Sequence, residues 1–359
     1  MSQTTLSSKA GGSVLADLDL ARLLLEGRAF FALIAIVVVF SLLSPYYFSV
    51  ANFLTMASHV AIYGILAVGM LLVVLNGGID LSVGSTLGLC GVAAGWLMQG
   101  IPVPGYVLYP PVWAVVVLTC ALGGLVGAVN GVLVARFRVP AFVATLGVMY
   151  VARGVALLIT NGLTYNNLAG RPELGNTGFD WLGFNRIAGV PIGVVVLAVV
   201  ALLGALVLNR TAFGRWLYSS GGNARAAELS GVPVKPVQIS VYVISGVCAA
   251  IAGLILSSQL TSAGPTAGTT YELTAIAAVV IGGAALTGGR GTVRGTMLGA
   301  FVIGFLSDGL VIIGISSYWQ TVFTGAVIVL AVMLNAVQYR RRPKALPPPG
   351  RPTLAPTAG

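Results

Sequence analysis

The feature that most constrains this chain is a series of apolar segments, each about long enough to cross a lipid bilayer, that covers most of its length. A membrane-spanning helix needs roughly 20 largely apolar residues. Only 8% of the residues are charged, whereas about a quarter are charged in a typical soluble domain. Such a chain cannot coat its own surface in water, so the sequence predicts an all-α integral membrane protein.

Ten segments fit this description, and two of them are short or interrupted by glycine. They are residues 29–43, 59–75, 81–97, 112–134, 141–159, 190–208, 237–256, 273–286, 296–315 and 319–337. The sequence therefore predicts about ten transmembrane helices within one permeation domain, residues 29–338. A polar N-terminal segment, residues 1–28, precedes it. A basic and then proline-rich tail, residues 339–359, follows it and is predicted to be disordered.

The distribution of basic residues predicts the orientation in the membrane. If the N-terminus lies in the cytosol, sixteen of the nineteen lysines and arginines fall on the cytosolic side. Positive residues concentrate on that side of membrane proteins, so both ends of the chain are predicted to be cytosolic. The same distribution argues against nucleic-acid binding, since the charges form no single patch. The only long outer loop, residues 160–189, is either a contact for an extracytoplasmic partner or a solvated connector.

One polar and basic stretch, residues 209–236, interrupts the apolar pattern on the predicted cytosolic side. It carries four basic residues and one acid, Glu228. It also contains the signature of a short helix, with Asn223 as the N-cap, ARAAELS as the body and Gly231 as the stop. A short helix in a cytosolic loop of a membrane protein is suited to docking a soluble partner.

Two glycine-rich stretches interrupt the apolar segments at comparable places in the two halves of the chain. They are NGGIDLSVGSTLG, residues 76–88, and TGGRGTVRGTMLG, residues 287–299, and they align at a fixed offset of 211. In the predicted topology both follow a segment that runs inwards, so this weak internal repeat is parallel. Paired interrupted segments indicate a transport pathway, although chance matches of glycine and alanine remain an alternative.

The sequence shows no site for a nucleotide, a metal or another cofactor. A phosphate-binding loop needs the pattern G-x-x-x-x-G-K-[ST], and none of the three lysines lies in one. The single histidine, His59, at the end of a predicted span, and the three cysteines have no metal-ligand spacing. We therefore expect no cofactor on this chain. If transport is driven by ATP, the ATP and its Mg²⁺ bind to a separate chain.

Four ionisable residues lie within or beside predicted spans, where charge is costly and usually functional. Asp80 lies in the first glycine break, where solvation is expected to be easy, and is either a structural cap or part of a gate. Arg153 either reaches the outer interface or lines the path. Glu272 is expected to favour a helix N-terminus. Asp308 is in mid-span, and Arg153 is a conceivable partner for it.

A neutral, hydroxyl-rich solute needs no charged site, and several polar side chains could serve it. These are Asn76, Ser82, Thr145, Tyr150, Asn161 and Gln320. A proton-coupled carrier would need a relay of carboxylates or histidines at membrane depth, which this chain supports poorly. The residues predicted to line a translocation path are Asn76, Asp80, Ser82, Tyr150, Arg153, Asn161, Glu272 and Asp308.

Four motifs in this order resemble the permease subunits of bacterial ABC importers for monosaccharides, the ribose, xylose and galactose group. The likeness extends from about residue 29 to residue 337, and the motifs are NGGIDLSVG, VPAFVATLGVMYVARGVALLITNG, GRWLYSSGGNARAAELSGV and YELTAIAAVVIGGAALTGGRGTVRGTMLGA. The resemblance implies a multi-pass protein of the bacterial inner membrane that is not itself an enzyme. It forms the translocation path for a sugar or a sugar-like polyol.

The resemblance also implies a set of partners. These are a second permease copy, either identical or a close paralogue, a cytosolic ABC ATPase, and a periplasmic or lipid-anchored sugar-binding protein, besides membrane lipid. The residues it assigns to ATPase coupling are Gly221, Gly222, Asn223, Ala224, Arg225 and Glu228. Two alternatives remain open: a permease for branched amino acids or nucleosides, and a self-sufficient secondary carrier.

Overall fold

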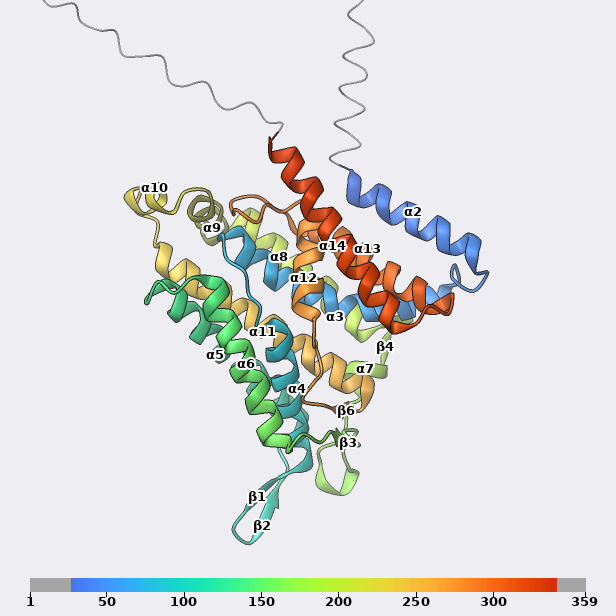
Figure 1. The fold of residues 1–359 in the computed structure, drawn as a ribbon. Helices are drawn as coiled ribbons and strands as arrows, with labels where there is room; N and C mark the ends of the chain where they lie inside the picture. Colours follow the sequence, from blue (N-terminus) through green and yellow to red (C-terminus); the bar gives the residue numbers. More distant parts are fainter. Residues whose placement is uncertain (1–26, 341–359) are drawn as a thin grey trace, which may run out of the picture.

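The computed structural model describes residues 27–340 and is mostly helical (Figure 1). The predictions for residues 1–26 and for the tail beyond residue 340 lie outside this part. The long helices are α2 (Arg28–Leu43), α3 (Val50–Leu75), α4 (Val83–Gln99), α5 (Val112–Ala135), α6 (Ala141–Thr160), α8 (Ile192–Arg210), α11 (Val234–Leu260), α13 (Val293–Ile312) and α14 (Ser317–Arg340). The shorter helices are α7 (Trp181–Phe184), α9 (Ala212–Gly222), α10 (Ala224–Leu229), α12 (Tyr271–Ile281) and the 3₁₀ turn η1 (Pro172–Leu174).

Each of the ten predicted segments overlaps a helix, but the count of ten membrane spans is not confirmed. Within the described residues, α3, α5, α6, α8, α11 and α13 are long and apolar enough to cross a bilayer. The apolar helices at residues 29–43 and 271–281 are shorter than a full span. The predicted end of the eighth segment at Leu286 was wrong. Helix α12 stops at Ile281 because Gly282 and Gly283 turn the chain, Gly283 with a φ of +89°.

Local signals in the sequence explain where several helices begin. The side chain of Ser49 accepts a hydrogen bond from the backbone nitrogen of Asn52, so α3 begins nine residues before the predicted start at His59. Thr292 caps α13 in the same way through Gly295. A proline stands directly before α5, α6, α8 and α11, where its fixed φ favours helix entry.

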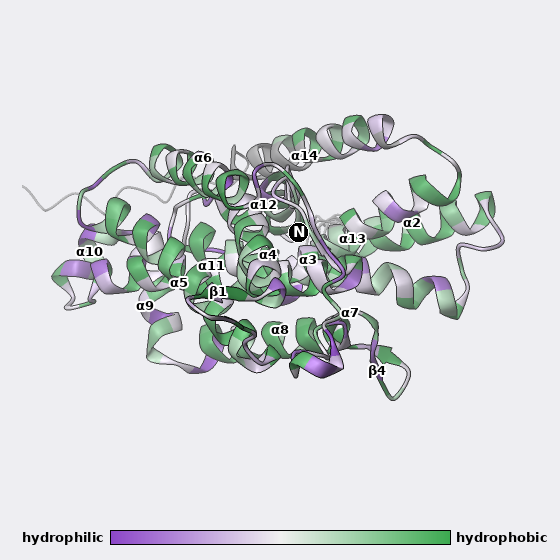
Figure 2. Cartoon of the chain, turned by 90° about the horizontal axis from the view of Figure 1, so that it is seen from below, coloured by the Kyte–Doolittle hydropathy of each residue, from purple (hydrophilic) through white to green (hydrophobic). Residues whose placement is uncertain are grey.

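Helices α3 and α11 form the centre of the bundle. Inside the fold, 83% of the most apolar window of α3 is buried, and 61% of that of α11. The corresponding shares are only 28% for α5, 22% for α6 and 22% for α8, although these helices are equally apolar. Figure 2 shows hydrophobic residues around the outer helices. A helix that is apolar on its exposed side is suited to lipid or to another membrane helix.

Glycines allow two pairs of helices to approach closely. In α5 and α11, a Cβ at Gly127 would overlap the backbone carbonyl of Tyr242, and one at Gly123 would overlap that of Gly246. In α12 and α13, a Cβ at Gly299 would overlap the carbonyl of Ala278. Small residues at such contacts are the usual basis of helix packing in membranes, where lipid tails are as apolar as leucine.

The connections at one end of the bundle are folded into short antiparallel strands. They pair β1 (Ile101–Val103) with β2 (Tyr106–Leu108), β3 (Tyr165–Asn166) with β6 (Ser262–Ala263), and β4 (Arg186–Ile187) with β5 (Val190–Pro191). Within the long connection from α6 to α8, Leu168, Asn176 and Phe179 are fully buried. This connection is therefore a packed element. The β1–β2 hairpin projects at the end opposite α10 (Figure 1).

Replacing Gly127 by alanine should destabilise the protein, because the new methyl group has to displace the backbone of α11. Overpacking of this kind costs about 1–3 kcal/mol. The matched control is Gly124→Ala, where the nearest atom, Val247 Cγ2, would lie 3.4 Å from the new Cβ. The measurement is thermal unfolding in detergent. Equal unfolding temperatures for the two variants would contradict the close α5–α11 contact.

Candidate functional site

The polar stretch between α8 and α11 folds into two short helices. The predicted one, α10, is confirmed: the Asn223 side chain accepts a hydrogen bond of 3.0 Å from Ala226 N, and Gly231 has a φ of +83°. The other, α9, was missed. Thr211 caps it by accepting a bond from Gly214 N at 3.3 Å. A threonine three residues before that glycine, followed by an amphipathic run, is the signal that could have found it.

The residues expected to couple with an ATPase are divided between these two helices. Gly221 and Gly222 end α9, whereas Ala224, Arg225 and Glu228 belong to α10, and Asn223 joins the two. Arg225 Nη1 lies 3.2 Å from Glu228 Oε2, with exposed side-chain fractions of 78% and 57%. An exposed pair of this spacing adds only about 0.3–0.5 kcal/mol to a helix. Both charges are accessible to a partner.

The end of α9 meets both glycine breaks at one junction. The backbone carbonyl of Leu75, at the end of α3, accepts a hydrogen bond of 2.8 Å from Gly289 N in the second break. A Cβ at Gly221 would overlap that same carbonyl. One at Gly288 would lie 3.0 Å from Gly77 N in the first break. Three segments far apart in the sequence therefore touch through backbone alone.

Two side chains of α9 reinforce the junction. Ser220 Oγ donates to Asn76 Oδ1 in the first break at 3.3 Å, and Tyr218 Oη donates to the carbonyl of Gly291 in the second at 2.8 Å. Burial raises the pKa of Tyr218 above its ordinary value, so the hydroxyl keeps its proton at neutral pH and remains a donor. Helix α9 is thus bonded to both breaks.

The two breaks have related but unequal geometry. At the predicted offset of 211, the first residue of α4, Val83, corresponds to Arg294, and α13 begins one residue earlier at Val293. The preceding helices end differently, since α3 reaches Leu75 and α12 stops five residues before the aligned Leu286. Each half contains a helix, a glycine break and a second helix, as the repeat suggested.

Asp80 lies at the centre of a buried polar network in the first break. Its Oδ1 accepts hydrogen bonds from the backbone nitrogen and the hydroxyl of Ser82, and its Oδ2 accepts one from Ser245. Ser82 in turn accepts a bond of 2.8 Å from the amide of Asn130. The expectation of easy solvation was wrong, because Asp80 is only 1% exposed. The network fixes the turn that leads into α4.

Arg153 and Glu272 lie on either side of the segment between α11 and α12. Arg153 Nη1 donates to the carbonyls of Pro265 and Ala267, at 2.5 and 2.8 Å. Glu272 is in the first turn of α12, as expected of a carboxylate near a helix N-terminus. Side chains at Gly84 and Gly88 would collide with Glu272 and Arg153 respectively. These two glycines therefore allow α4 to pack against this segment.

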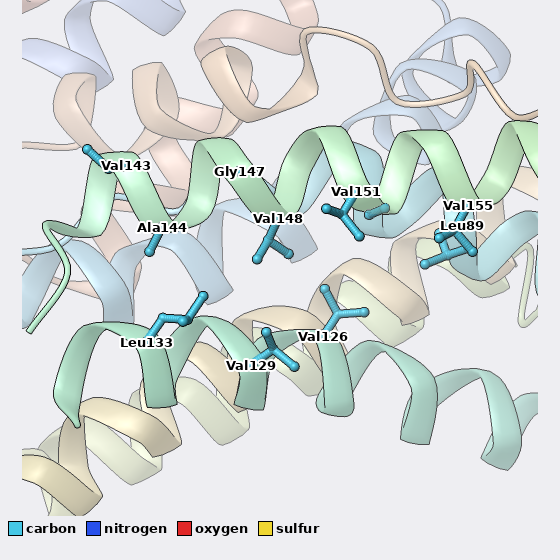
Figure 3. A pocket seen from close by; sticks show the side chains of 11 residues that line it. Leu89, Val126, Val129, Leu133, Val143, Ala144, Gly147, Val148, Val151 and Val155 are labelled. Carbon is cyan, nitrogen blue, oxygen red and sulfur yellow. The ribbon is translucent and has the colours of Figure 1, made fainter. Parts of the chain in front are cut away.

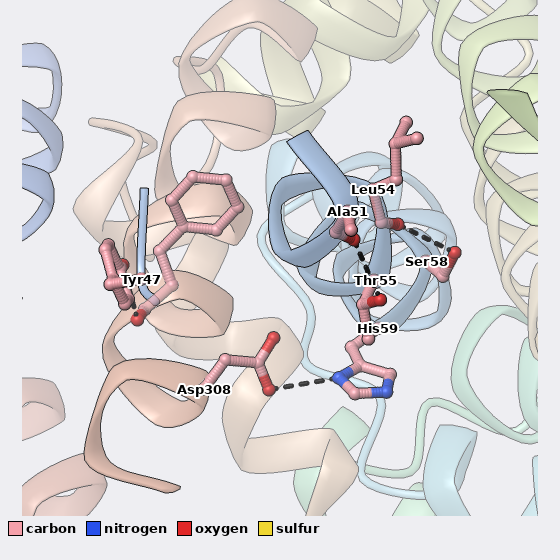
Figure 4. Close-up of polar contacts among 8 residues, drawn as sticks. Tyr47, Ala51, Leu54, Thr55, Ser58, His59 and Asp308 are labelled. Atoms are coloured by element: carbon pink, nitrogen blue, oxygen red, sulfur yellow. Dashed lines mark hydrogen bonds and ion pairs between the residues drawn. The ribbon is translucent and has the colours of Figure 1, made fainter. Parts of the chain in front are cut away.

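Asp308 pairs with His59 and not with Arg153, the partner considered from the sequence. Its Oδ1 lies 3.0 Å from His59 Nδ1 (Figure 4). Arg153 bonds instead to the connection between α11 and α12. His59 is the tenth residue of α3, so its placement at a span end was also wrong. The His59 side chain is 50% exposed and that of Asp308 is 17% exposed. Asp308 Oδ2 is buried without a hydrogen-bond partner within the described residues.

Tyr150 and Asn161, the remaining predicted path residues, do not join these groups. Tyr150 is 69% exposed on α6, and Asn161 ends that helix in the left-handed conformation. A groove between α5 and α6 has valine, leucine, alanine and glycine as its lining residues (Figure 3). With no polar side chain in its lining, the groove is suited to an apolar occupant. The structure therefore separates the predicted path into distinct groups.

A bundle of long apolar helices with paired glycine breaks, and with a short helix bonded to both breaks, is typical of a membrane transport protein. Over residues 52–332 the sequence matches the family described as the permease component of the branched-chain amino acid transport system. The chain belongs to this permease family, whose members near it in sequence are permeases of ABC importers. It is accordingly a transport subunit of the inner membrane and not an enzyme.

Several relatives are similar over nearly their whole length. The ribose import permease protein RbsC of Escherichia coli is 43% identical over 312 residues, covering 87% of this chain and 94% of that protein. RbsC of Bacillus subtilis is 41% identical over 307 residues, covering 85% and 91%. The xylose transport system permease protein XylH of Escherichia coli is 36% identical, covering 82% and 87%. No solved structure gives a significant match to the chain.

Replacing Gly221 by alanine should disrupt the junction and strongly reduce solute uptake, because its Cβ has to displace the Leu75 carbonyl. Overpacking against backbone costs about 1–3 kcal/mol. The neighbouring Gly222, which is also assigned to ATPase coupling, is a matched control for the steric effect on unfolding, since a Cβ there meets no atom within 4 Å. The measurements are uptake by cells and thermal unfolding of the purified protein. Equal unfolding temperatures of the Gly221→Ala and Gly222→Ala variants, or unchanged uptake by Gly221→Ala, would contradict this assignment.

Proposed function

We propose that this chain is the membrane-spanning permease subunit of an ABC importer and forms the translocation path for a sugar or a sugar-like polyol. The observation that carries the substrate class is the similarity to ribose and xylose permeases over nearly their full length. A binding protein outside the cell delivers the solute in this proposal. A cytosolic ATPase, which binds ATP and Mg²⁺, drives its passage.

The contacts of α9 and α10 support the coupling part of the proposal. Helix α10 exposes Arg225 and Glu228, whereas α9 is bonded to Asn76 and Gly291, one in each glycine break. A force that a partner exerts on α10 is therefore transmitted to both glycine breaks through the short helix α9. The assigned roles are docking for α10 and transmission for α9.

The proposed path follows the broken segments. Irregular backbone at membrane depth is tolerated only where protein buries it or where it lines an aqueous cavity. Among the ionisable residues predicted there, Asp308 retains an unused acceptor oxygen and its partner His59 is half-exposed. The half-exposed His59 ring is accessible to solute hydroxyls, and Asp308 holds that ring in place. Asp80 and Arg153 instead hold the frame of the path, since their bonds are internal.

A second permease copy is proposed to complete the path. Helix α6 is apolar, is among the least buried of the long helices, and exposes Phe142, Tyr150 and Leu158. Gly147 and Gly154 on the same helix have free space beside them, which allows a neighbouring helix to approach. The exposed face of α6 is therefore assigned to the contact between the two copies.

The proposed topology has ten membrane segments with both ends in the cytosol. Helix α10, the start of α2 and the end of α14 lie toward one end of the bundle in Figure 1, and the β1–β2 hairpin lies at the other. The first of these ends carries most of the basic residues, which assigns it to the cytosol.

The second candidate substrate class is branched-chain amino acids, because the matching family is described by them. A titration of the partner binding protein with ribose, xylose, galactose, leucine and nucleosides separates the classes. Tight binding of a sugar is the expected result. Binding of leucine alone would move the chain to the amino-acid class and leave the importer architecture intact.

Reversing the charge of Arg225 or Glu228 should uncouple transport from ATP hydrolysis while the permease still inserts. The ion pair stabilises α10 by only about 0.3–0.5 kcal/mol, so the fold should persist. The measurement is solute-stimulated ATP hydrolysis in the reconstituted complex. The doubly reversed variant Arg225→Glu/Glu228→Arg restores the pair within α10. Full recovery in this variant would show that the pair acts within the helix and does not dock a partner.

Cysteines placed in residues 221–230 should react with impermeant reagents only from the cytosolic side. The background variant replaces Cys90, Cys120 and Cys248 by serine, and the control is Tyr106→Cys in the exposed β1–β2 hairpin. That control should react from outside intact cells. Labelling of residues 221–230 from outside would overturn the proposed orientation.

A further inference from the structure

A pocket of about 400 Å³ lies beside α10, where the start of α11 and the connection between α5 and α6 come together. Its polar lining consists of Arg138, Arg225, Glu228, Lys235 and Gln238. The three cations and the single carboxylate leave a net charge of +2. Such a pocket favours an anionic group.

Two of the cations are not engaged by the chain itself. Glu228 pairs with Arg225 on α10. Arg138 and Lys235 are exposed, and neither side chain makes a hydrogen bond or an ion pair within residues 27–340. The positive charge of the pocket is therefore available to another molecule.

The backbone of Arg138 is in an unusual conformation. Its φ is +58°, in the left-handed region that favours glycine. The carbonyl of Leu133 accepts a hydrogen bond of 3.1 Å from Val139 N, which closes the end of α5 in the manner of a glycine C-cap. Glycine would suit this position better than arginine. Unfavourable conformations of this kind concentrate at functional sites, which makes the Arg138 side chain a candidate for a role of its own.

Two exposed apolar residues are sequence neighbours of the pocket residues Arg138 and Glu228. Phe137 is 68% exposed on the α5–α6 connection, and Leu229 is 75% exposed at the end of α10. Arginine beside aromatic and aliphatic groups is typical of energetically important protein contacts. Two elements far apart in the sequence thus present one mixed basic and apolar surface.

We propose that the α5–α6 connection is a second docking element for the cytosolic ATPase, and that Arg138 and Lys235 receive an acidic side chain of that subunit. The inference rests on the proposed function and extends its contact surface beyond α10. Residues of α10 line one side of the pocket, so a protein that binds this helix also covers the pocket.

The test uses the whole permease in nanodiscs of neutral phosphatidylcholine, with its full-length ATPase subunit and binding protein. The decisive variant is Arg138→Gly. Glycine adopts a positive φ without steric cost, and the substitution removes the guanidinium group. The matched control is Arg136→Ala, since Arg136 lies on the same connection with a φ of −94° and outside the pocket lining. The measurements are thermal unfolding and the Kd for the ATPase at several salt concentrations.

Arg138→Gly should unfold at the same temperature as the wild type or a higher one, yet bind the ATPase about threefold to tenfold more weakly at low salt. Its affinity should also depend less steeply on salt. Arg136→Ala should bind like the wild type. A purely structural role for Arg138 would not give higher stability together with weaker binding.

Three outcomes would overturn the inference. One is unchanged affinity of Arg138→Gly while charge reversal at Arg225 abolishes binding, which would leave the proposed function standing. Another is equal loss in Arg138→Gly and Arg136→Ala. In the third, added phosphatidylglycerol stabilises the wild type but not Arg138→Gly, and the affinity for the ATPase is the same in both. That result would identify a lipid headgroup as the occupant. Failure of the wild type to bind the ATPase would instead reject the proposed function.

Discussion

The structure depends on one constraint, which is that a helix broken inside an apolar bundle must find partners for the backbone groups it frees. Helix α3 ends at Leu75, whose carbonyl can no longer bond within the helix. Gly289 of the other half of the chain supplies the donor. The second glycine break thus supplies a donor for the backbone carbonyl that ends the helix before the first break.

This pairing also explains why the exposed helices lie where they do. The backbone of Gly221 rests against the same Leu75 carbonyl, so α9 is fixed at the point where the breaks meet. Ser220 and Tyr218 then bond to one break each. A movement of α9 cannot leave either break unchanged. The surface assigned to docking is therefore attached to both glycine breaks of the membrane domain.

Patterns in the sequence predicted the helices well because apolar length and capping residues act locally. The ten segments and α10 with its Asn223 cap followed from such signals. Contacts between distant segments could not be found in this way. The pairing of Asp308 with His59, 249 residues apart, and the burial of Asp80 by Ser245 depend on how the helices pack. The start of α3 was misplaced because its first turns include the polar Asn52, Thr55 and Ser58, which interrupt the apolar pattern.

The polar residues of this chain divide by whether their bonding capacity is used within the fold. Asp80 and Arg153 drew attention because charge inside a membrane is costly, yet their observed hydrogen bonds are to groups of the fold. These bonds stabilise a turn and a connection, so ionisable residues at membrane depth also serve the frame of the fold. Asp308 keeps a buried oxygen without a partner, and Arg138 keeps its guanidinium free at the cost of an unfavourable backbone. Unused capacity that the fold maintains against its own stability is the stronger indication of a role in contact with another molecule.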